Sequence, residues 1–278
     1  MSAGPLPPAY LLSALAHLQE TPPGNRPHVT LTYAQSLDAK IAGQHGKQLI
    51  LSGKESMIMT HWMRTLHDGI MIGVGTAVND DPQLNTRHLP PRFDHIHHPL
   101  PRPIILDPTL RLSPTCKLLN NYRANTGRQP WVLCSPPEQG DDRAHWQQRH
   151  QKLSQAGASI IELEQPSQRH FPSFHPCSHN PHPFFSHILP VSAVLQKLSS
   201  LGIKSLMVEG GARIINSFLQ ASLSTPLIDA LIVTVAPTLI GTDGVSYSSA
   251  IPTHIPTLQH LDTQVVGPDA VIILKPSK

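Results

Sequence analysis

Three polar residues with chemical potential follow a short apolar segment. Residues 70–74 are apolar and flanked by glycines, which is typical of a strand buried on both faces of a parallel sheet. Thr76, Asp80 and Arg87 come next. Ligands of open α/β sheets bind beyond the carboxyl ends of strands, so these side chains are candidates for a binding site. Thr76 could cap a helical turn whose N–H groups face a phosphate, or it could only precede an Asp-Asp-Pro turn.

A second junction of the same kind lies later in the chain. Residues 205–208 read as a strand, Gly210 and Gly211 as a turn, and residues 211–222 as an amphipathic helix. Two glycines at a helix start let backbone amides approach an anion such as pyrophosphate. The turn lacks the G-x-G-x-x-G spacing of a Rossmann fingerprint, and an ordinary tight connection explains it nearly as well.

The elements that must position these residues alternate along the chain. We expect strands at 28–35, 69–75, 103–107, 130–134, 159–163, 204–209, 228–235 and 270–275, and helices at 8–19, 142–156, 191–200 and 211–222. A further helix begins at Ser52 with a capping box to Glu55. This alternation predicts an α/β fold with a mostly parallel central sheet and helices on both faces. The last two strands follow each other without a helix, which predicts an antiparallel edge.

Two segments, 88–103 and 165–190, are rich in proline and histidine and show no periodicity. The second contains Cys177, His179 and His182, a spacing that could ligate a metal. Because no second ligand pair accompanies these residues, we interpret the segment as a proline-rich insert and predict no metal site.

Composition fits an enzyme that acts on small molecules. The 278 residues suit one domain, here 28–278 after an N-terminal extension with a helix at 1–27. The formal net charge of +3 and the lack of a basic stripe argue against nucleic acid, while the basic pI of 8.8 suits a phosphorylated ligand. Three widely spaced cysteines indicate a reducing compartment. We found neither a signal peptide nor a membrane span, so a cytoplasmic location is expected.

Taken with residues 29–42, the two junctions resemble one family. The segments A-x-S-x-D-x-K-I-A, G-x-x-T-x-x-x-D-D-P-x-L-x-x-R and V-E-G-G occur here in the order seen in the pyrimidine reductases of riboflavin biosynthesis. The stand-alone fungal and archaeal members are the most similar, followed by the reductase half of the bacterial deaminase-reductase. The resemblance implies a dihydrofolate-reductase-like fold, NADPH as cofactor and a homodimer. It also implies reduction of the ribose side chain of 2,5-diamino-6-ribosylamino-4(3H)-pyrimidinone 5′-phosphate.

The resemblance also implies roles for individual residues. The positions that match cofactor contacts are Thr76, Asp80, Ile161 (or Ile160), Glu209, Gly210, Gly211, Ala212 and Arg213. The positions that match substrate contacts are Arg64, Leu84, Arg87 and Glu209. Arginine forks suit a ribose 5′-phosphate. Without the resemblance, both arginines would be interpreted as solvated surface charges.

No catalytic acid is assigned. Asp38 is a candidate to orient or protonate the substrate, and it could equally form a turn. Ala39 stands where the family commonly has glycine, and Thr32 stands where bacterial relatives have lysine. The chain shows no H-x-E or P-C-x-x-C element of a zinc deaminase, which separates it from the bifunctional enzyme.

Three alternatives stay open. The first is reduction after deamination, with 5-amino-6-(5-phosphoribosylamino)uracil as the substrate. The second is another reductase on the same scaffold, such as a dihydrofolate reductase. The third is a protein that binds nucleotides without catalysis.

Overall fold

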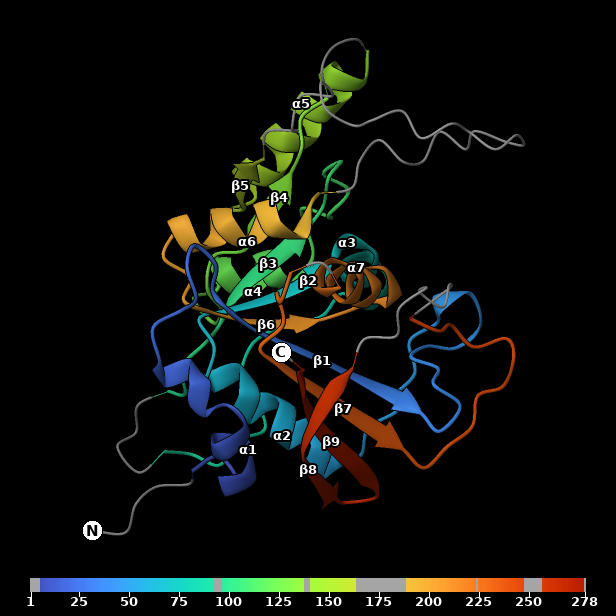
Figure 1. Cartoon of the computed structure of the whole chain (residues 1–278). Coiled ribbons are helices and arrows are strands. Elements are labelled where there is room, and N and C mark those ends of the chain that lie inside the picture. Colours follow the sequence, from blue (N-terminus) through green and yellow to red (C-terminus); the bar gives the residue numbers. More distant parts are fainter. Residues whose placement is uncertain are drawn as a thin grey trace, which may run out of the picture.

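The computed structural model describes residues 6–92, 97–137, 141–163, 189–223, 225–247 and 257–277. Within these ranges, nine strands form one sheet in the order β5-β4-β3-β2-β6-β1-β7-β9-β8 (Figure 1). Neighbours from β5 to β7 are parallel, whereas β9 is antiparallel to both β7 and β8. The strands are β1 (His28–Ser36), β2 (Gly69–Gly73), β3 (Arg102–Leu106), β4 (Trp131–Cys134), β5 (Ser159–Glu162), β6 (Ser205–Glu209), β7 (Ala230–Ala236), β8 (Leu258–Val266) and β9 (Asp269–Pro276). The predicted mostly parallel α/β fold with an antiparallel edge is confirmed.

Helices cover both faces of the sheet. The α-helices are α1 (Ala9–Ala14), α2 (Lys54–Thr65), α3 (Val74–Asp80), α4 (Lys117–Arg123), α5 (Asp141–Gln155), α6 (Val191–Ser200) and α7 (Ala212–Ser222), and the 3-10 helices are η1 (Ala16–Gln19) and η2 (Gln44–Gly46). In Figure 1, α6 and α7 lie on one side of the sheet, while α1 and α2 lie on the other. Among the described residues, no helix is long and apolar enough to cross a membrane.

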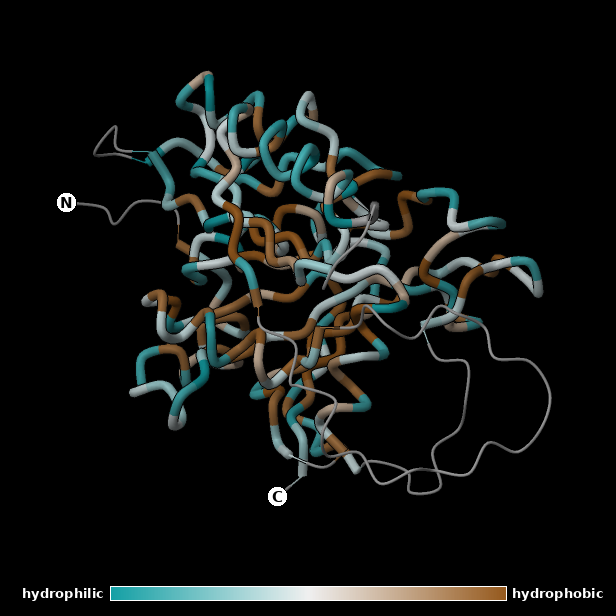
Figure 2. The backbone as a smooth tube through the Cα atoms, turned by 90° about the horizontal axis from the view of Figure 1, so that it is seen from above, coloured by the Kyte–Doolittle hydropathy of each residue, from teal (hydrophilic) through white to brown (hydrophobic). Residues whose placement is uncertain are grey.

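Alternating side chains of the central strands build the core on each face. On β6, Leu206 and Val208 join the cluster that contains residues of α6 and α7. Met207, between them, points the other way and packs with residues of α1 and α2. A third cluster unites β2 and β3 with α3, α4 and α5. In Figure 2 the hydrophobic stretches gather in the interior along these strands.

The strand order reverses direction between β2 and β6. The chain leaves β2 through α3 toward β3, on one side in the sheet order, and leaves β6 through α7 toward β7, on the other. The two connecting helices therefore pack on opposite faces, as the separate core clusters show. In open α/β folds such a switch point leaves a crevice beyond the carboxyl ends of the two strands, where ligands bind.

Several sequence predictions need correction. The strand expected at 69–75 ends at Gly73, because α3 begins at Val74 and buries Val74 and Ala77. The capping box at Ser52 is wrong: Gly53 is the N-cap residue of α2, and no side chain of its own segment caps the helix. Instead, the carboxylate of Asp269 on β9 accepts the Gly53 N–H at 2.7 Å. The predictions also omitted α3, α4 and β8 as elements.

The proline-rich segments have different outcomes. The stretch expected at 88–103 gives way to β3 at Arg102. Within it, the His98 ring meets the Trp62 ring of α2 edge-on, with 5.2 Å between centroids. The insert at 165–190 lies almost entirely outside the described residues, as do Cys177, His179 and His182.

Candidate active site at the carboxyl edge of the sheet

Thr76 and Gly211 meet at the switch point. A Cβ added to Gly211 would lie 2.7 Å from Thr76 Oγ1, and one added to Gly73 would lie 2.8 Å from a side-chain carbon of Ile214. Figure 1 shows α3 and α7 side by side at this edge. Thr76 does not cap a helix as expected, because it lies inside α3 and Gly73 is the N-cap residue. The two junctions singled out in the sequence thus meet at one place, where a Cβ at position 211 would force Thr76 or the start of α7 to shift.

The start of α7 offers backbone donors at this crevice. Gly211 is the N-cap residue, and no side chain satisfies the first N–H groups of the helix. These amides, with the positive end of the helix dipole, favour an anion by about 1 kcal/mol. Arg213 lies in the first turn and is exposed, so its charge is available near the same anion.

Two other residues expected to contact the cofactor, Asp80 and Ile161, lie at different distances along the sheet from the β2–β6 switch point. Asp80, the last residue of α3, is half-buried, and this burial raises the pKa of its carboxyl group. Ile161 lies on β5 and is 8% exposed within the core cluster shared with α6. Because β5 lies beyond β4 and β3 from β2, the assignment of Ile161 to the cofactor stays a prediction.

Arg64 and Glu209 form a bidentate ion pair beside the crevice. Arg64 Nε and Nη2 donate to the two carboxylate oxygens of Glu209, at 3.0 and 2.8 Å. The Arg64 side chain is 11% exposed and that of Glu209 is 21% exposed, so the pair is largely removed from water. Thr32 is the register partner of Glu209 on β1, and its side chain is buried. Arg64 is therefore not the solvated charge that its helix pattern allows.

Arg87 differs from Arg64 because no carboxylate pairs with it among the residues that the structure describes. Its Nη1 atom is buried and has no hydrogen-bond partner. Burial, followed by repulsion from Arg64, lowers the pKa of the guanidinium. The preceding Leu84 is buried in the core with a left-handed φ of 46°, so only its backbone is available to a ligand. A half-buried cation that has no counter-ion among the described residues is suited to bind an anionic ligand.

Sequence reasoning missed His61, which is 2% exposed in α2. The Arg87 backbone N–H donates to His61 Nδ1 at 3.1 Å. The sequence offered one indication: His61 lies three positions before Arg64, so the two side chains lie on the same side of the helix, and it is next to the apolar Trp62.

Asp38 is a turn residue in this structure. Its carboxylate accepts hydrogen bonds from the Ser36 hydroxyl and from the backbone N–H groups of Ile240 and Gly241. These bonds, with the Ser36 bond the largest cause, lower its pKa to about 2, so Asp38 is a carboxylate near neutral pH. The next residue, Ala39, has a left-handed φ of 57°, which explains why glycine would suit that position.

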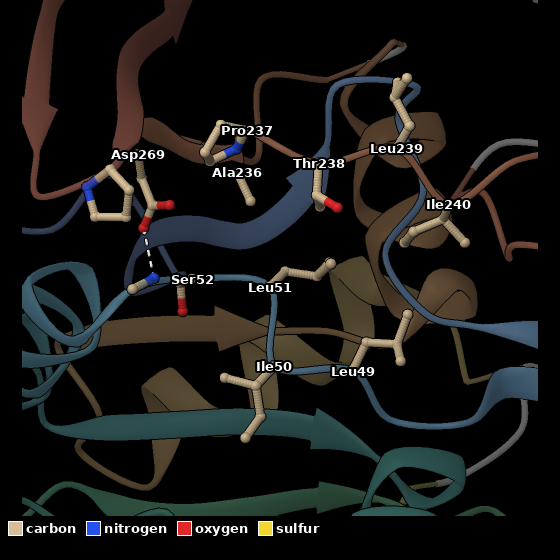
Figure 3. Close-up of a pocket in the computed structure, with 12 residues that line it drawn as sticks. Leu49, Ile50, Leu51, Ser52, Ala236, Pro237, Thr238, Leu239, Ile240 and Asp269 are labelled. Carbon is tan, nitrogen blue, oxygen red and sulfur yellow. Dashed lines mark hydrogen bonds between the residues drawn. The ribbon is translucent and has the colours of Figure 1, made fainter.

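A second hollow opens at the same edge, beyond β1 and β7. It has a volume of about 650 Å³ and lies between residues 49–53, residues 236–240, and the β9 start at Pro268 and Asp269. Figure 3 shows Leu49 and Leu51 across from the 236–240 segment, while the side chain of Ile50 points away from it. This apolar wall was not anticipated from the sequence.

The described residues hold no group of three or more His, Cys, Asp or Glu side chains placed to bind a metal ion. Cys116 and Cys134 are both buried free thiols. Burial raises the pKa of Cys134 to about 12, so this thiol is not a nucleophile at neutral pH.

Comparison with known proteins gives the family context. The family model of the RibD C-terminal domain matches residues 27–272. A Debaryomyces hansenii protein named 2,5-diamino-6-ribosylamino-4(3H)-pyrimidinone 5′-phosphate reductase is 38% identical over 252 residues, covering 89% of this chain and 90% of the relative. The Schizosaccharomyces pombe protein of the same name is 31% identical over 274 residues, covering 90% and 88%.

Solved structures of riboflavin biosynthesis proteins are similar to this chain. Acinetobacter baumannii RibD has 25% identity and a TM-score of 0.65, and the match covers 91% of this chain but 58% of that protein. The Saccharomyces cerevisiae riboflavin biosynthesis reductase Rib7 has 25% identity and a TM-score of 0.64, covering 96% of this chain and 99% of that protein.

Proposed function

The chain belongs to the RibD C-terminal domain family, and on this premise we propose that it reduces 2,5-diamino-6-ribosylamino-4(3H)-pyrimidinone 5′-phosphate to its ribitylamino form with NADPH. The observation that carries the proposal is a juxtaposition at one edge of the sheet. Thr76 and Gly211 meet at the carboxyl end of β6, and the last residue of that strand is Glu209, which pairs with Arg64 of α2.

The residues at the crevice fit a dinucleotide. A family of reductases implies a nicotinamide cofactor, and the open amides at the start of α7 suit its pyrophosphate. A Cβ at Gly211 would lie 2.7 Å from Thr76 Oγ1, so glycine lets the start of α7 lie close against α3. When bound, the nicotinamide supplies a hydride. Asp80 and Thr76, both half-buried on α3, line the other wall.

Arg87 is the residue that we assign to the substrate's 5′-phosphate. Its buried Nη1 lacks a partner, whereas Arg64 is already held by Glu209. A phosphate at Arg87 would satisfy the open donor and offset the repulsion between the two guanidinium groups. Arg64 then contributes charge from the side while Glu209 fixes its direction.

Reduction requires positioning more than acid-base power. The opened form of a ribosylamine is an imine, which gains a hydride at C1′ and a proton at nitrogen to become the ribitylamine. The chain's task is to hold C1′ near the cofactor by its phosphate at one end and its ring at the other. The apolar hollow beyond β1 and β7 is a candidate seat for the ring. We assign no proton donor.

The test is NADPH oxidation with purified protein and each of two substrates, the 2,5-diamino compound and 5-amino-6-(5-phosphoribosylamino)uracil. We expect turnover of the first, with a product heavier by two hydrogen atoms. A clear preference for the uracil compound would place reduction after deamination. NADPH binding without turnover of either substrate, or of dihydrofolate, would leave only a binding role.

NADPH rather than NADH is part of the proposal, and exposed Arg213 is the residue that would meet a 2′-phosphate. Replacing Arg213 with Ala should raise KM for NADPH about tenfold, since a charge-assisted hydrogen bond contributes about 1.5–3 kcal/mol. KM for NADH should stay unchanged. Equal effects on both cofactors would remove this assignment.

We also propose a cytoplasmic homodimer. Support comes from the free thiols Cys116 and Cys134 and from the edge strand β8, where Leu258, Leu261 and Val265 are exposed. Light scattering of the purified chain would show a dimer mass, and a monomer at micromolar concentration would contradict it.

A further inference from the structure

His61 lies inside the substrate side of the site without being aimed at a ligand. It is 2% exposed and sits one helical turn before Arg64 on α2. The His88 ring meets it edge-on, with 5.2 Å between centroids. Three groups that carry or can carry positive charge therefore surround this imidazole: Arg64, Arg87 and His88.

The hydrogen bond from the Arg87 backbone fixes the state of the ring. His61 Nδ1 accepts that N–H at 3.1 Å, so Nδ1 carries no proton and the neutral ring holds its proton on Nε2. Burial is the largest cause that lowers the pKa of His61, to about 3, and the charges of Arg64 and Arg87 act in the same direction. The acceptor is thus maintained at any pH at which the enzyme would work.

Helix α2 holds the 85–87 segment at two points. Arg64 Nη1 donates to the Asn85 carbonyl at 3.0 Å, and His61 accepts the Arg87 N–H. Because His61 and Arg64 are three residues apart, they lie on the same side of the helix. Together they fix the backbone on either side of Thr86, and hence the point from which the Arg87 side chain starts.

We infer that His61 is a positioning residue, which holds the Arg87 backbone so that the guanidinium is presented to the substrate's 5′-phosphate. The inference rests on the proposed function, because that function assigns Arg87 to the phosphate. It adds a residue that touches neither substrate nor cofactor and acts only through Arg87.

A core histidine with a merely structural role is the competing explanation, and the same part of the chain supplies a matched control. His67, just after α2, is also buried, with Nδ1 2.7 Å from the Met63 carbonyl and Nε2 2.9 Å from Thr30 Oγ1. Neither partner belongs to the 85–87 segment. Losing His67 should therefore lower stability without changing how Arg87 is presented.

Three substitutions separate the acceptor from the ring. In His61→Asn, the amide oxygen can occupy the place of Nδ1 and keep the bond to the Arg87 N–H. His61→Gln carries its polar group farther out, toward the place of Nε2, and His61→Leu has no acceptor. His67→Leu is the control. Circular dichroism at the assay temperature checks that each variant is folded.

The probe is ribose 5-phosphate, whose binding calorimetry measures without any turnover. We expect His61→Leu and His61→Gln to weaken binding about tenfold, the size of a lost well-aligned hydrogen bond next to a charge. His61→Asn and His67→Leu should bind as the unchanged protein does. In turnover, His61→Leu should raise KM for the phosphorylated substrate and leave kcat and the NADPH affinity unchanged.

A double-mutant cycle with Arg87→Ala decides the route of the effect. If His61 acts through Arg87, His61→Leu has no further effect on ribose 5-phosphate binding once Arg87 is Ala. Additive losses, or normal binding by His61→Leu while Arg87→Ala is weakened, would overturn the inference and leave the phosphate site standing. Unchanged binding by Arg87→Ala would instead overturn the phosphate site and, with it, this inference.

Discussion

The two sides of the site are built in different ways. The proposed cofactor side consists of backbone at two helix starts, Gly73 to Thr76 and Gly210 to Ala212, where glycines allow close packing. The proposed substrate side consists of side chains: Arg64 reaches Glu209, 145 residues away, and His61 holds Arg87. The first side is local in sequence, whereas the second exists only after the sheet has formed.

This difference teaches where sequence patterns are informative. A Gly-Gly sequence between a strand and a helix predicts a tight turn with accessible backbone amides. An anion-binding place can therefore be expected there before the fold is known. The position of an arginine on a helix does not predict which side chain it pairs with. Arg64 and Arg87 have the same charge, yet within the described part of the chain the fold gives a carboxylate to one and no partner to the buried Nη1 of the other.

We expect the largest effect from a substitution that breaks the Arg64–Glu209 ion pair. Glu209→Gln should lower the free energy of unfolding by about 2–3 kcal/mol, because it leaves the Arg64 guanidinium without its counter-charge in a mostly buried place. It should also cut kcat/KM severely. Urea denaturation and steady-state kinetics measure both losses.

Glu162→Gln is the matched control, since that half-exposed carboxylate lies 3.7 Å from His150 and its pair should contribute less than about 0.5 kcal/mol. Equal losses in the two variants would show that the Arg64–Glu209 pair is an ordinary surface pair.

Next in size is a change on the backbone side. Gly211→Ala should lower stability by about 1–3 kcal/mol, because the added Cβ would lie 2.7 Å from Thr76 Oγ1, and the resulting shift of the first α7 amides should weaken NADPH binding about tenfold. Quenching of protein fluorescence by NADPH measures it. In a Thr76→Ala background the clash is absent, so Gly211→Ala should add little. If Gly211→Ala weakened NADPH binding as much in the Thr76→Ala protein as in the unchanged one, contact with Thr76 would not be the cause.

The pH dependence of stability sharpens the substrate side. His61 has a folded pKa of about 3 and His67 of about 4, both lowered chiefly by burial, whereas unfolded histidine titrates near 6.5. Below pH 6.5 the unfolded chain takes up protons that the folded chain refuses, so stability falls as pH decreases. At pH 5, each of the two histidines should lower the free energy of unfolding by up to about 2 kcal/mol.

His61→Asn removes one of these contributions. The difference between urea midpoints at pH 7 and pH 5 should therefore shrink in this variant. A difference equal to that of the unchanged protein would mean that the His61 ring is protonated in the folded state.

The smallest effect concerns the start of α2, where a local signal failed. Ser52→Ala should change stability by less than about 0.5 kcal/mol, since the Ser52 side chain makes no capping bond. Asp269→Ala should cost about 1–2 kcal/mol, because it leaves the Gly53 N–H without its acceptor. Thermal unfolding of both variants measures the contrast, and a larger loss for Ser52→Ala would restore the capping box.

Much of the fold follows from the sequence because buried parallel strands are short apolar runs between glycines and prolines. The helix at 191–200 was predicted with the observed ends, and each predicted strand corresponds to an observed one within two residues at each end. Helix α3 was missed because Val-Gly-Thr-Ala-Val continues the apolar run of β2. Strand β8 was missed because both of its faces are largely exposed, which erases the alternation of period two.

The site was predictable only in part, for the same reason. Thr76 and Gly211, which the resemblance assigns to the cofactor, lie together in the structure. The pairing of Arg64 with Glu209 and the bond from Arg87 to His61 depend on tertiary packing that no local pattern encodes. The assignment of Ile161 to the cofactor stays a prediction: its strand, β5, belongs to the same parallel part of the sheet and lies beyond β4 and β3 from β2.

The most direct test of the account is a crystal structure of the protein with NADP and ribose 5-phosphate. We predict the pyrophosphate against the first amides of α7, beside Thr76, and the sugar phosphate on Arg87, with the bond from the Arg87 N–H to His61 intact. A cofactor bound away from the β2–β6 crevice, or a phosphate held elsewhere while Arg87 stays without a partner, would contradict it.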